Sequence, residues 1–459
     1  MALNLDQLRV ERTARRILIS RLLTRSGDQA WDFAVPLTLV KLLPDSLQVA
    51  VVYYLVIRLG QALLGPRVGS LIDRWQRLRV AKAAIGLQMV GILGGIGALI
   101  FLPAVRHGGP VVRDLPLLAL FVVIVVFGVV SSLGALMMEI AVANDIIPTV
   151  VPAEQLAHVN SRLKQIDLAT EVGSPIVAGL LLTVSSATFP LLGFAIIAGW
   201  NFLSFAPEYL LIASVLKSVK VLSEKPLSKS AAMSEGLAAR LLRGWRGFFA
   251  QPIMPSMVAY ALLWLSVLSP HGVILTAFLK DGWHLSEPMI GVFRGLGAVF
   301  GLVSTVLFPW LGARHGLLAA SRAFILFQAG ILSAGLVLFF RNGEWGRIGF
   351  LATVLLSRIG LYGFGLGETQ IRQVAIPEQT RGEVNSFASA LTSVATLGLY
   401  GAGAIFANPA DFHVLVVGSI SFVVLGAVLF SLWSLRGGQQ IPELKSADAV
   451  FNASASRGA

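Results

Sequence analysis

The sequence predicts an all-α polytopic membrane protein with about twelve spanning helices, and two observations lead to this prediction. Of its 459 residues, 56% are hydrophobic and only 13% are charged, whereas an average globular domain carries about 25% charged residues. Apolar stretches of about 20 residues recur along the chain, and each can cross a hydrocarbon core about 30 Å thick. Because lipid offers the backbone no hydrogen-bond partners, such stretches must form helices.

The expected spans divide into two groups of six. We place them at residues 15–43, 47–72, 80–104, 115–142, 164–185, 189–214, 255–280, 288–311, 318–340, 346–372, 383–407 and 411–435. The division is an N-terminal half (1–214), a polar linker (215–253), a C-terminal half (254–436) and a tail (437–459). Within the linker, the stretch from Leu237 to Phe249 predicts a helix that lies on the surface of anionic lipid.

The distribution of charge predicts the orientation. The net charge is +12, but the basic residues lie in short segments between apolar stretches, which disfavours nucleic acid as a partner. This is the positive-inside pattern, and it predicts a plasma (inner) membrane protein with both termini in the cytoplasm. The chain contains no Cys, so disulfides and thiolate metal sites are excluded. We expect no cleaved signal peptide and a monomeric protein.

A nine-residue motif joins the second and third spans. Gly69-Ser-Leu-Ile-Asp73-Arg74-Trp-Gln-Arg77 resembles the G-x-L-x-D-R-x-G-R signature of the major facilitator superfamily, with Gln76 in place of the second Gly. Its charges, above all Asp73 and Arg74, are expected to form ion pairs that hold one conformational state. The alternative is an ordinary basic loop. The segment from Gly301 to Gly316 looks like a degraded copy in the second half.

The first span carries an unusual set of polar residues. Thr24, Asp28 and Asp32 step by four and therefore share one helix face. Gly27 is expected to let the helix open beside Asp28 and expose carbonyl oxygens. A carboxylate with hydroxyl and carbonyl oxygens suits a divalent cation. The alternatives are that Asp28 pairs with Arg25 and that Thr24 bonds to its own helix.

The sixth span contains a polar stripe. Asn201, Ser204, Phe205 and Glu208 follow the i, i+3, i+4, i+7 pattern of one helix face. Pro207 lacks an amide donor, so we expect a helix break beside the stripe. An ion site is the favoured interpretation, and polar packing between helices is the alternative.

The seventh span contains Pro270-His271-Gly272 between apolar flanks. Proline and glycine around a histidine predict an unwound segment with an exposed imidazole, which serves either metal binding or proton transfer. The alternative is a histidine bonded to a neighbouring helix. Asp145 and Arg358 are interpreted as gate partners rather than ligands. Glu171, Arg294 and Glu368 are also polar residues within spans, and the sequence assigns them no role.

Several strings together resemble a known family. LLTRSGDQAWDF, IDLATEVGSP, LLWLSVLSPHGV and RGLGAVFGL are similar to ferroportins, specifically to bacterial members of that iron-exporter family. The resemblance implies a major facilitator fold in two six-helix halves, working by alternating access. It also implies efflux of Fe²⁺, with Co²⁺ and Ni²⁺ accepted as related divalent metals.

The resemblance also implies site residues. The first-half metal site corresponds to Thr24, Asp28, Asn201, Ser204 and the backbone of Phe205, and the second-half site to His271. A calcium site corresponds to Asp28, Gln88, Asn201 and Glu208, so the two first-half sites share Asp28 and Asn201.

The chain departs from vertebrate members of the family at two positions. They have a cysteine where this chain has Gly272, and a histidine near the position of Ala395. Because that cysteine serves the binding of both metal and a peptide hormone, hormone control is not expected here.

Other function classes have less support. A major facilitator exporter of organic solutes would need a wide apolar cavity, and the pairing of Asp28 with Asn201 argues against it. A receptor or scaffold would not need charges buried in both halves. No nucleophile–base pair, cofactor motif or nucleotide-binding loop indicates an enzyme or an ATP-driven pump. We therefore expect a secondary transporter, with proton exchange as an additional expectation.

Overall fold

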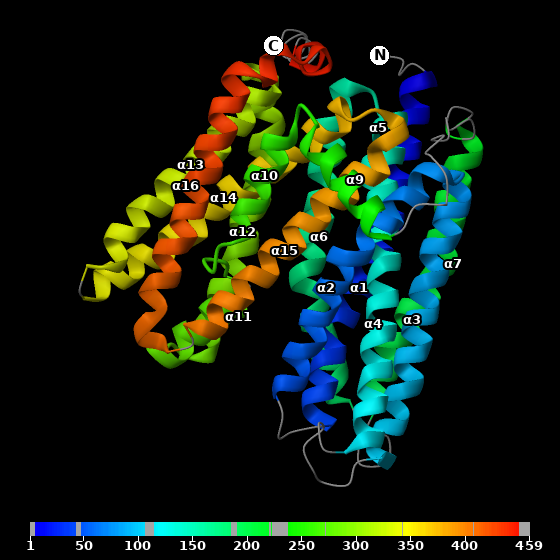
Figure 1. The fold of residues 1–459 in the computed structure, drawn as a ribbon, viewed down its shortest axis with the longest axis vertical. Coiled ribbons are helices and arrows are strands. Elements are labelled where there is room, and N and C mark those ends of the chain that lie inside the picture. The colour runs from blue at the N-terminus through cyan, green and yellow to red at the C-terminus, as the bar shows by residue number, and fades with distance from the viewer. Residues whose placement is uncertain are drawn as a thin grey trace. The chain divides into compact units, whose positions relative to one another are not determined.

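The computed structural model describes residues 5–42, 47–105, 114–184, 191–219, 222, 237–270, 272–341, 343–406 and 408–448. Helices account for nearly all of these ranges, as expected for a chain whose backbone must satisfy its own hydrogen bonds in lipid. Figure 1 shows the helices in chain order, coloured from blue to red.

The described residues of the N-terminal half form seven α-helices and one π-helical segment. Their bounds are α1 Leu5–Leu42, α2 Leu47–Arg74, α3 Arg77–Val105, α4 Leu115–Ile140, η2 Ala141–Ile146, α5 Ile147–Val150, α6 Ala153–Thr183 and α7 Leu192–Ser218. The helix α6 begins well before the expected start at residue 164, because its polar first turns are helical outside the apolar stretch.

The second half begins with a separate short helix and then an interrupted span. The bounds are α9 Leu237–Phe249, α10 Met254–Leu263, α11 Val273–Ala277, η3 Phe278–Gly282, α12 Glu287–His315, α13 Leu317–Phe339, α14 Glu344–Ala375, η4 Glu378–Thr380, α15 Arg381–Ile405, η5 Pro409–Asp411, α16 Phe412–Arg436 and η6 Gly438–Gln440. The interruption between α10 and α11 agrees with the unwound segment expected around Pro270 and Gly272.

Among the described residues, 10 helices are long and apolar enough to cross a membrane. The interrupted seventh span is not among these ten helices, because its apolar helix α10, Met254–Leu263, is too short. The charged residues of α1 lower its hydropathy, although its 38 residues exceed the length that a span requires. The chain is thus a multi-pass helical membrane protein, and the count of twelve stays a prediction.

Contacts between residues divide the chain into two compact units. Unit 1 consists of 1–150, 169–234 and 378–390, and unit 2 of 151–168, 235–377 and 391–459. Each unit therefore takes in one segment from the other half of the sequence: the first turns of α15 belong to unit 1, and the first turns of α6 belong to unit 2.

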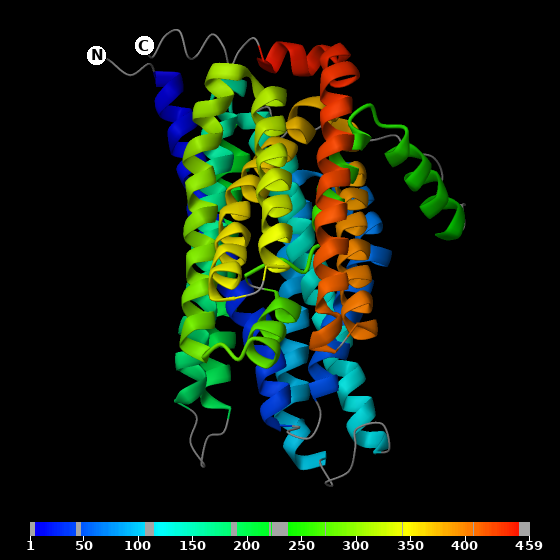
Figure 2. The ribbon, with the colours of Figure 1, turned by 90° about the vertical axis from the view of Figure 1, so that its left-hand side faces the viewer.

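Close helix contacts within each unit depend on small residues. In unit 1, α3 and α4 lie side by side (Figure 1), and a Cβ on Gly91 would lie 2.6 Å from the backbone of Ser131. In unit 2, α13 packs along α14 (Figure 2), and a Cβ on Gly360 would lie 2.7 Å from the carbonyl oxygen of Phe324. Any larger side chain at either glycine would push the paired helices apart.

The tail folds back onto unit 2. The amide of Leu317, at the start of α13, donates to the Asp448 carboxylate. Gly316 has a φ of 85°, and a Cβ there would lie 2.8 Å from Asp448 Oδ1, so both its backbone and its contact require glycine. Burial raises the pKa of Asp448 above its ordinary value, whereas the amides of Leu317 and Leu318 act in the opposite direction.

Candidate functional site

The polar stripe of α7 lies on its buried face. Asn201 is 1% exposed and Glu208 is 0% exposed, and Ser204 and Phe205 are also buried. Leu203, on the opposite face, is 70% exposed. This face of α7 packs against α1 and α3, so the sequence pattern correctly identified the inward side.

The predicted break at Pro207 is wrong. The helix α7 runs without interruption from Leu192 to Ser218, because a single missing amide donor is tolerated where the flanking turns stay helical. The Ser204 hydroxyl donates to the Asn201 carbonyl at 2.7 Å. The side chains of the stripe, rather than a freed backbone, are therefore the groups that α7 offers to an ion.

The predicted opening of α1 at Gly27 is also wrong. The helix α1 is continuous from Leu5 to Leu42, and Gly27 serves a different purpose. A Cβ at this position would lie 2.9 Å from Asn201 Oδ1, so the glycine lets the Asn201 amide approach the α1 backbone. Thr24 is buried and Asp28 is half-buried on the same helix, one turn apart on the face that was expected.

Three side chains in this part of unit 1 have buried polar atoms without a hydrogen-bond partner. They are Gln88 through both amide atoms, Glu208 through both carboxyl oxygens, and Asn201 through Nδ2. Thr24 lies beside Glu208, but its hydroxyl donates to the Ser20 carbonyl at 2.9 Å. Each unpaired buried group costs about 1–3 kcal/mol, so three such side chains on the contacting helices α3 and α7 call for an explanation.

These groups can serve as hard oxygen ligands. The carboxylate of Glu208 interacts electrostatically with that of Asp28, and the Gln88 carbonyl oxygen comes from a third helix, α3. Carboxylate, amide and hydroxyl oxygens suit a divalent cation. No group of three or more His, Cys, Asp or Glu side chains forms a metal cluster among the residues that the structure describes. The first-half candidates thus offer a mixed set of carboxylate, amide and hydroxyl oxygens.

Two arginines lie one and two turns before Asp28 on α1. Arg21 and Arg25 both pair with Glu139 of α4, at 3.8 and 3.9 Å. Arg25 also interacts electrostatically with Asp28. Because Glu139 already provides Arg25 with a carboxylate, Arg25 does not need Asp28 as its counter-charge. This disfavours the alternative in which Asp28 serves only as the partner of Arg25.

The second-half candidate is centred on the unwound segment of unit 2. His271 itself lies outside the described residues. The backbone beside it is held by two other helices: Arg358 of α14 donates to the Leu268 carbonyl at 2.7 Å, and the Val267 amide donates to the Ser419 hydroxyl of α16 at 2.9 Å. Arg358 was expected to be a gate residue, and the structure places it against the interrupted span.

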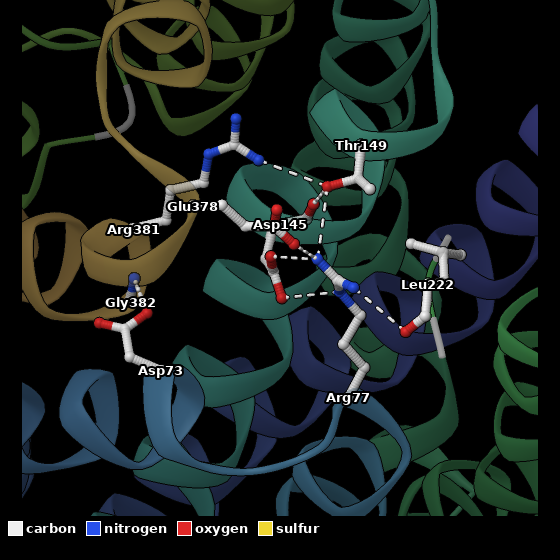
Figure 3. Close-up of polar contacts among 8 residues, drawn as sticks. All are labelled: Asp73, Arg77, Asp145, Thr149, Leu222, Glu378, Arg381 and Gly382. Atoms are coloured by element: carbon white, nitrogen blue, oxygen red, sulfur yellow. Dashed lines mark hydrogen bonds and ion pairs between the residues drawn. The ribbon is translucent and has the colours of Figure 1, made fainter. Parts of the chain in front are cut away.

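Two of the other expected gate residues, Asp73 and Asp145, lie in unit 1, and Figure 3 shows them among the polar contacts around Arg77. The amides of Gly382 and Glu383, in the first turn of α15, both donate to the Asp73 carboxylate at 2.7 Å. Asp145 accepts from Arg77 at 2.9 and 3.1 Å. Arg74 is half-buried at the end of α2.

Arg77 was not among the expected gate residues, although it binds Asp145. Its guanidinium also donates to Glu378 and, at 3.1 Å, to the Leu222 carbonyl. Thr149 accepts from both Arg77 and Arg381 at 3.4 Å. The signal was present, because Arg77 is the last residue of the motif, but its partners on η2, α5 and η4 are distant in sequence.

Glu368, to which the sequence assigned no role, lies in a buried ion pair on α14. Its carboxylate forms an ion pair with Arg372 at 2.8 Å, one turn later on α14, and Glu368 is 1% exposed. This buried pair explains how α14 carries both charges, without assigning them a part in ion binding.

Comparisons with known proteins agree with this architecture. The family model described as Ferroportin1 (FPN1) matches residues 11–423. A protein of Bdellovibrio bacteriovorus named Ferreportin is 46% identical over 433 residues, which are 94% of this chain and 96% of that protein.

Solved structures are similar as well. A bacterial homologue of the iron transporter ferroportin, in the outward-facing state, has a TM-score of 0.84 at 45% identity, covering 92% of this chain and 100% of its own. Its form with soaked iron has a TM-score of 0.83 at 44% identity, covering 92% and 99%. The proton:xylose symporter XylE has a TM-score of 0.63 at 15% identity, covering 95% and 99%. The fold is that of the major facilitator superfamily.

Proposed function

Since the chain belongs to the ferroportin family, we propose that it exports Fe²⁺ across the membrane by alternating access. The family resemblance noted in the sequence is confirmed, and the family comprises membrane transporters rather than enzymes. The observation that carries the proposal is the group of buried oxygens in unit 1 that have no protein donor, on Gln88 and Glu208. Thr24, Asp28, Asn201 and Ser204, with the backbone of Phe205, would form the transport site beside them.

The same group of residues fits a calcium ion. Asp28, Gln88, Asn201 and Glu208 would supply two carboxylates and two amide oxygens from three helices, which is a hard, flexible ligand set. Because Asp28 and Asn201 belong to both sets, calcium and the transported metal would compete. Calorimetry tests this: heat of calcium binding should be lost in Glu208→Ala, and unchanged binding would exclude this ligand set.

The second half would add His271 on the unwound segment. A neutral imidazole binds metal and a protonated imidazole does not, so acidification through about pH 6.5 should weaken metal binding there. We propose that exchange with protons accompanies export, with His271 and Asp28 as carriers, and that Co²⁺ and Ni²⁺ are also accepted.

The gate contacts of unit 1 support alternating access. Asp73 caps the first turn of α15, and Arg77 joins Asp145 to Glu378. These contacts can hold one state only if they break in the other. The basic segments support cytoplasmic termini in a plasma-membrane protein, which we propose to act as a monomer.

The test is metal flux in proteoliposomes with the internal pH recorded. Wild-type protein should move Fe²⁺ down its gradient, with opposite proton movement and competition by Co²⁺ and Ni²⁺. An organic-solute exporter would leave the metal flux at the level of empty vesicles, which would refute the proposal. Identical metal affinity and pH profile in His271→Ala would reduce that histidine to a packing residue.

A further inference from the structure

The helix α9 has a feature that ion transport does not require. It precedes the first span of the second half, and its two faces differ sharply in chemistry. Leu242, Trp245 and Phe249 follow an i, i+3, i+7 pattern on one face, whereas Arg246 borders this face and Arg243, one turn earlier, lies farther round the helix.

The apolar face of α9 is only partly covered by the protein. Phe248 is 1% exposed, whereas Leu242 is 60% exposed and Phe249 is 52% exposed. The rings of Trp245 and Phe249 stack with centroids 5.8 Å apart. One edge of the apolar face therefore packs into unit 2 and the other edge points outward, with the exposed Arg246 beside it.

The connection to the following helix fixes where α9 lies along unit 2. Only four residues separate the end of α9 from the start of α10. In this turn the Pro252 carbonyl accepts from Trp433 Nε1 of α16 at 2.8 Å, and tryptophan is enriched at membrane–water interfaces. Figure 2 shows α9 as a green helix inclined to the long orange-red α16 rather than parallel to it.

We propose that α9 docks on the bilayer surface, with Leu242 and Phe249 among the upper acyl chains and with Arg243 and Arg246 bound to anionic lipid headgroups. An exposed apolar strip bordered by arginines, at the entry to a span, matches the chemistry of an interfacial helix. Arginine stems can bury their methylenes while the guanidinium groups reach the headgroups. This binding partner is separate from the transported ion and does not depend on the proposed function.

The absence of cysteine allows a direct test. We would introduce Leu242→Cys on the outward edge or Gly247→Cys on the opposite face, where a Cβ meets no neighbouring atom within 4 Å. Each protein is labelled with an environment-sensitive fluorophore and reconstituted in vesicles of phosphatidylcholine, with or without phosphatidylglycerol. A neutral lipid that carries a nitroxide quencher on its acyl chain is present in both.

The label at position 242 should be quenched strongly in vesicles that contain phosphatidylglycerol and less in phosphatidylcholine alone, whereas the label at 247 should be quenched weakly in both. Each basic residue near an anionic surface contributes about 1 kcal/mol, so Arg243→Gln with Arg246→Gln should weaken docking roughly 30-fold. The matched control, Arg436→Gln with Lys445→Gln, removes two exposed charges outside α9 and should keep the quenching.

Equal quenching at positions 242 and 247 would overturn the proposal, since docking requires one face to be inserted. Quenching at 242 that is the same in both vesicle types, or unchanged in the Arg243 and Arg246 double variant, would also overturn it. In that case the exposed strip would be available to a protein partner rather than to anionic lipid.

Discussion

In the first half, Asn201 and Glu208 stand on an unbroken helix, whereas the second half interrupts its first span between Leu263 and Val273. The first arrangement presents side-chain oxygens on rigid helices. The second one frees backbone groups, of which Arg358 binds the Leu268 carbonyl and the Ser419 hydroxyl accepts from the Val267 amide. A protein can therefore prepare an ion site either by leaving buried side chains unpaired or by unwinding a helix and fixing its backbone from outside.

The largest effect on metal flux is expected from substitution of Asp28 in the first half. Asp28→Ala removes a carboxylate from the first-half candidates, and His271, the second-half candidate, is not a carboxylate that could replace it. Substitution of a residue that only supports a metal ligand already lowers metal affinity or activity about 10–100-fold. Loss of a ligand should therefore lower Fe²⁺ flux in proteoliposomes by at least that factor. Asp411→Asn, an exposed change at the start of α16, serves as the control. Wild-type flux in a monodisperse Asp28→Ala protein would contradict the assignment.

Much of this first-half site was accessible from sequence, because helix periodicity alone places Thr24 beside Asp28 and aligns Asn201 with Glu208. The breaks expected at Gly27 and Pro207 failed for a physical reason. Glycine and proline permit a break, but tertiary packing decides whether it forms, and Gly27 instead accommodates Asn201. At Pro270 and Gly272 the break does form, because Arg358 and Ser419 satisfy the released backbone groups.

The next effect concerns the gate of unit 1. Asp145→Asn leaves the Arg77 guanidinium buried with a weaker counter-charge, and removing one partner of a buried ion pair costs about 3–5 kcal/mol. We expect the lower end of that range because Glu378 remains. The Tm in detergent should fall clearly, whereas Glu443→Gln on the exposed tail should leave it unchanged. Equal Tm values for Asp145→Asn and wild type would show that the pair is energetically neutral.

A smaller effect on local stability is expected at the interrupted span between α10 and α11. Arg358→Ala deprives the Leu268 carbonyl of its donor, and an unpaired buried group costs about 1–3 kcal/mol. Amide hydrogen exchange in residues 264–273 should therefore accelerate, while exchange in α7 stays as in wild type. Arg358→Lys keeps the charge and one donor and should recover part of the protection. Uniform acceleration in both regions would mean that Arg358 stabilises the fold in general.

The smallest effect concerns two helix starts, of α15 and α13, that are capped by aspartates from distant parts of the chain. Asp73 caps α15 from within the motif, whereas the degraded copy has no acid at that place, and Asp448 of the tail caps α13 instead. Because the pKa of Asp448 is raised in the docked tail, the docked state binds the proton more tightly than the free tail. Docking should therefore strengthen as pH falls from the raised pKa towards the ordinary value, and weaken as pH rises through that window.

Limited proteolysis of the tail at several pH values, compared with a protease control substrate, measures this dependence. Asp448→Asn keeps an oxygen acceptor but does not titrate, so its cleavage should not vary with pH. Protection of the wild-type tail that grows with rising pH would contradict the sign of the predicted change.

The central claim is that oxygens of the first half bind the transported metal, and anaerobic titration of purified protein with Fe²⁺ tests it most directly. Wild type and Asp411→Asn should bind with equal affinity. Asp28→Asn preserves the side-chain shape but removes the charge, and its affinity should fall roughly 10-fold or more. Equal affinity in Asp28→Asn and wild type would contradict the claim and would move the binding site out of the α1–α3–α7 group.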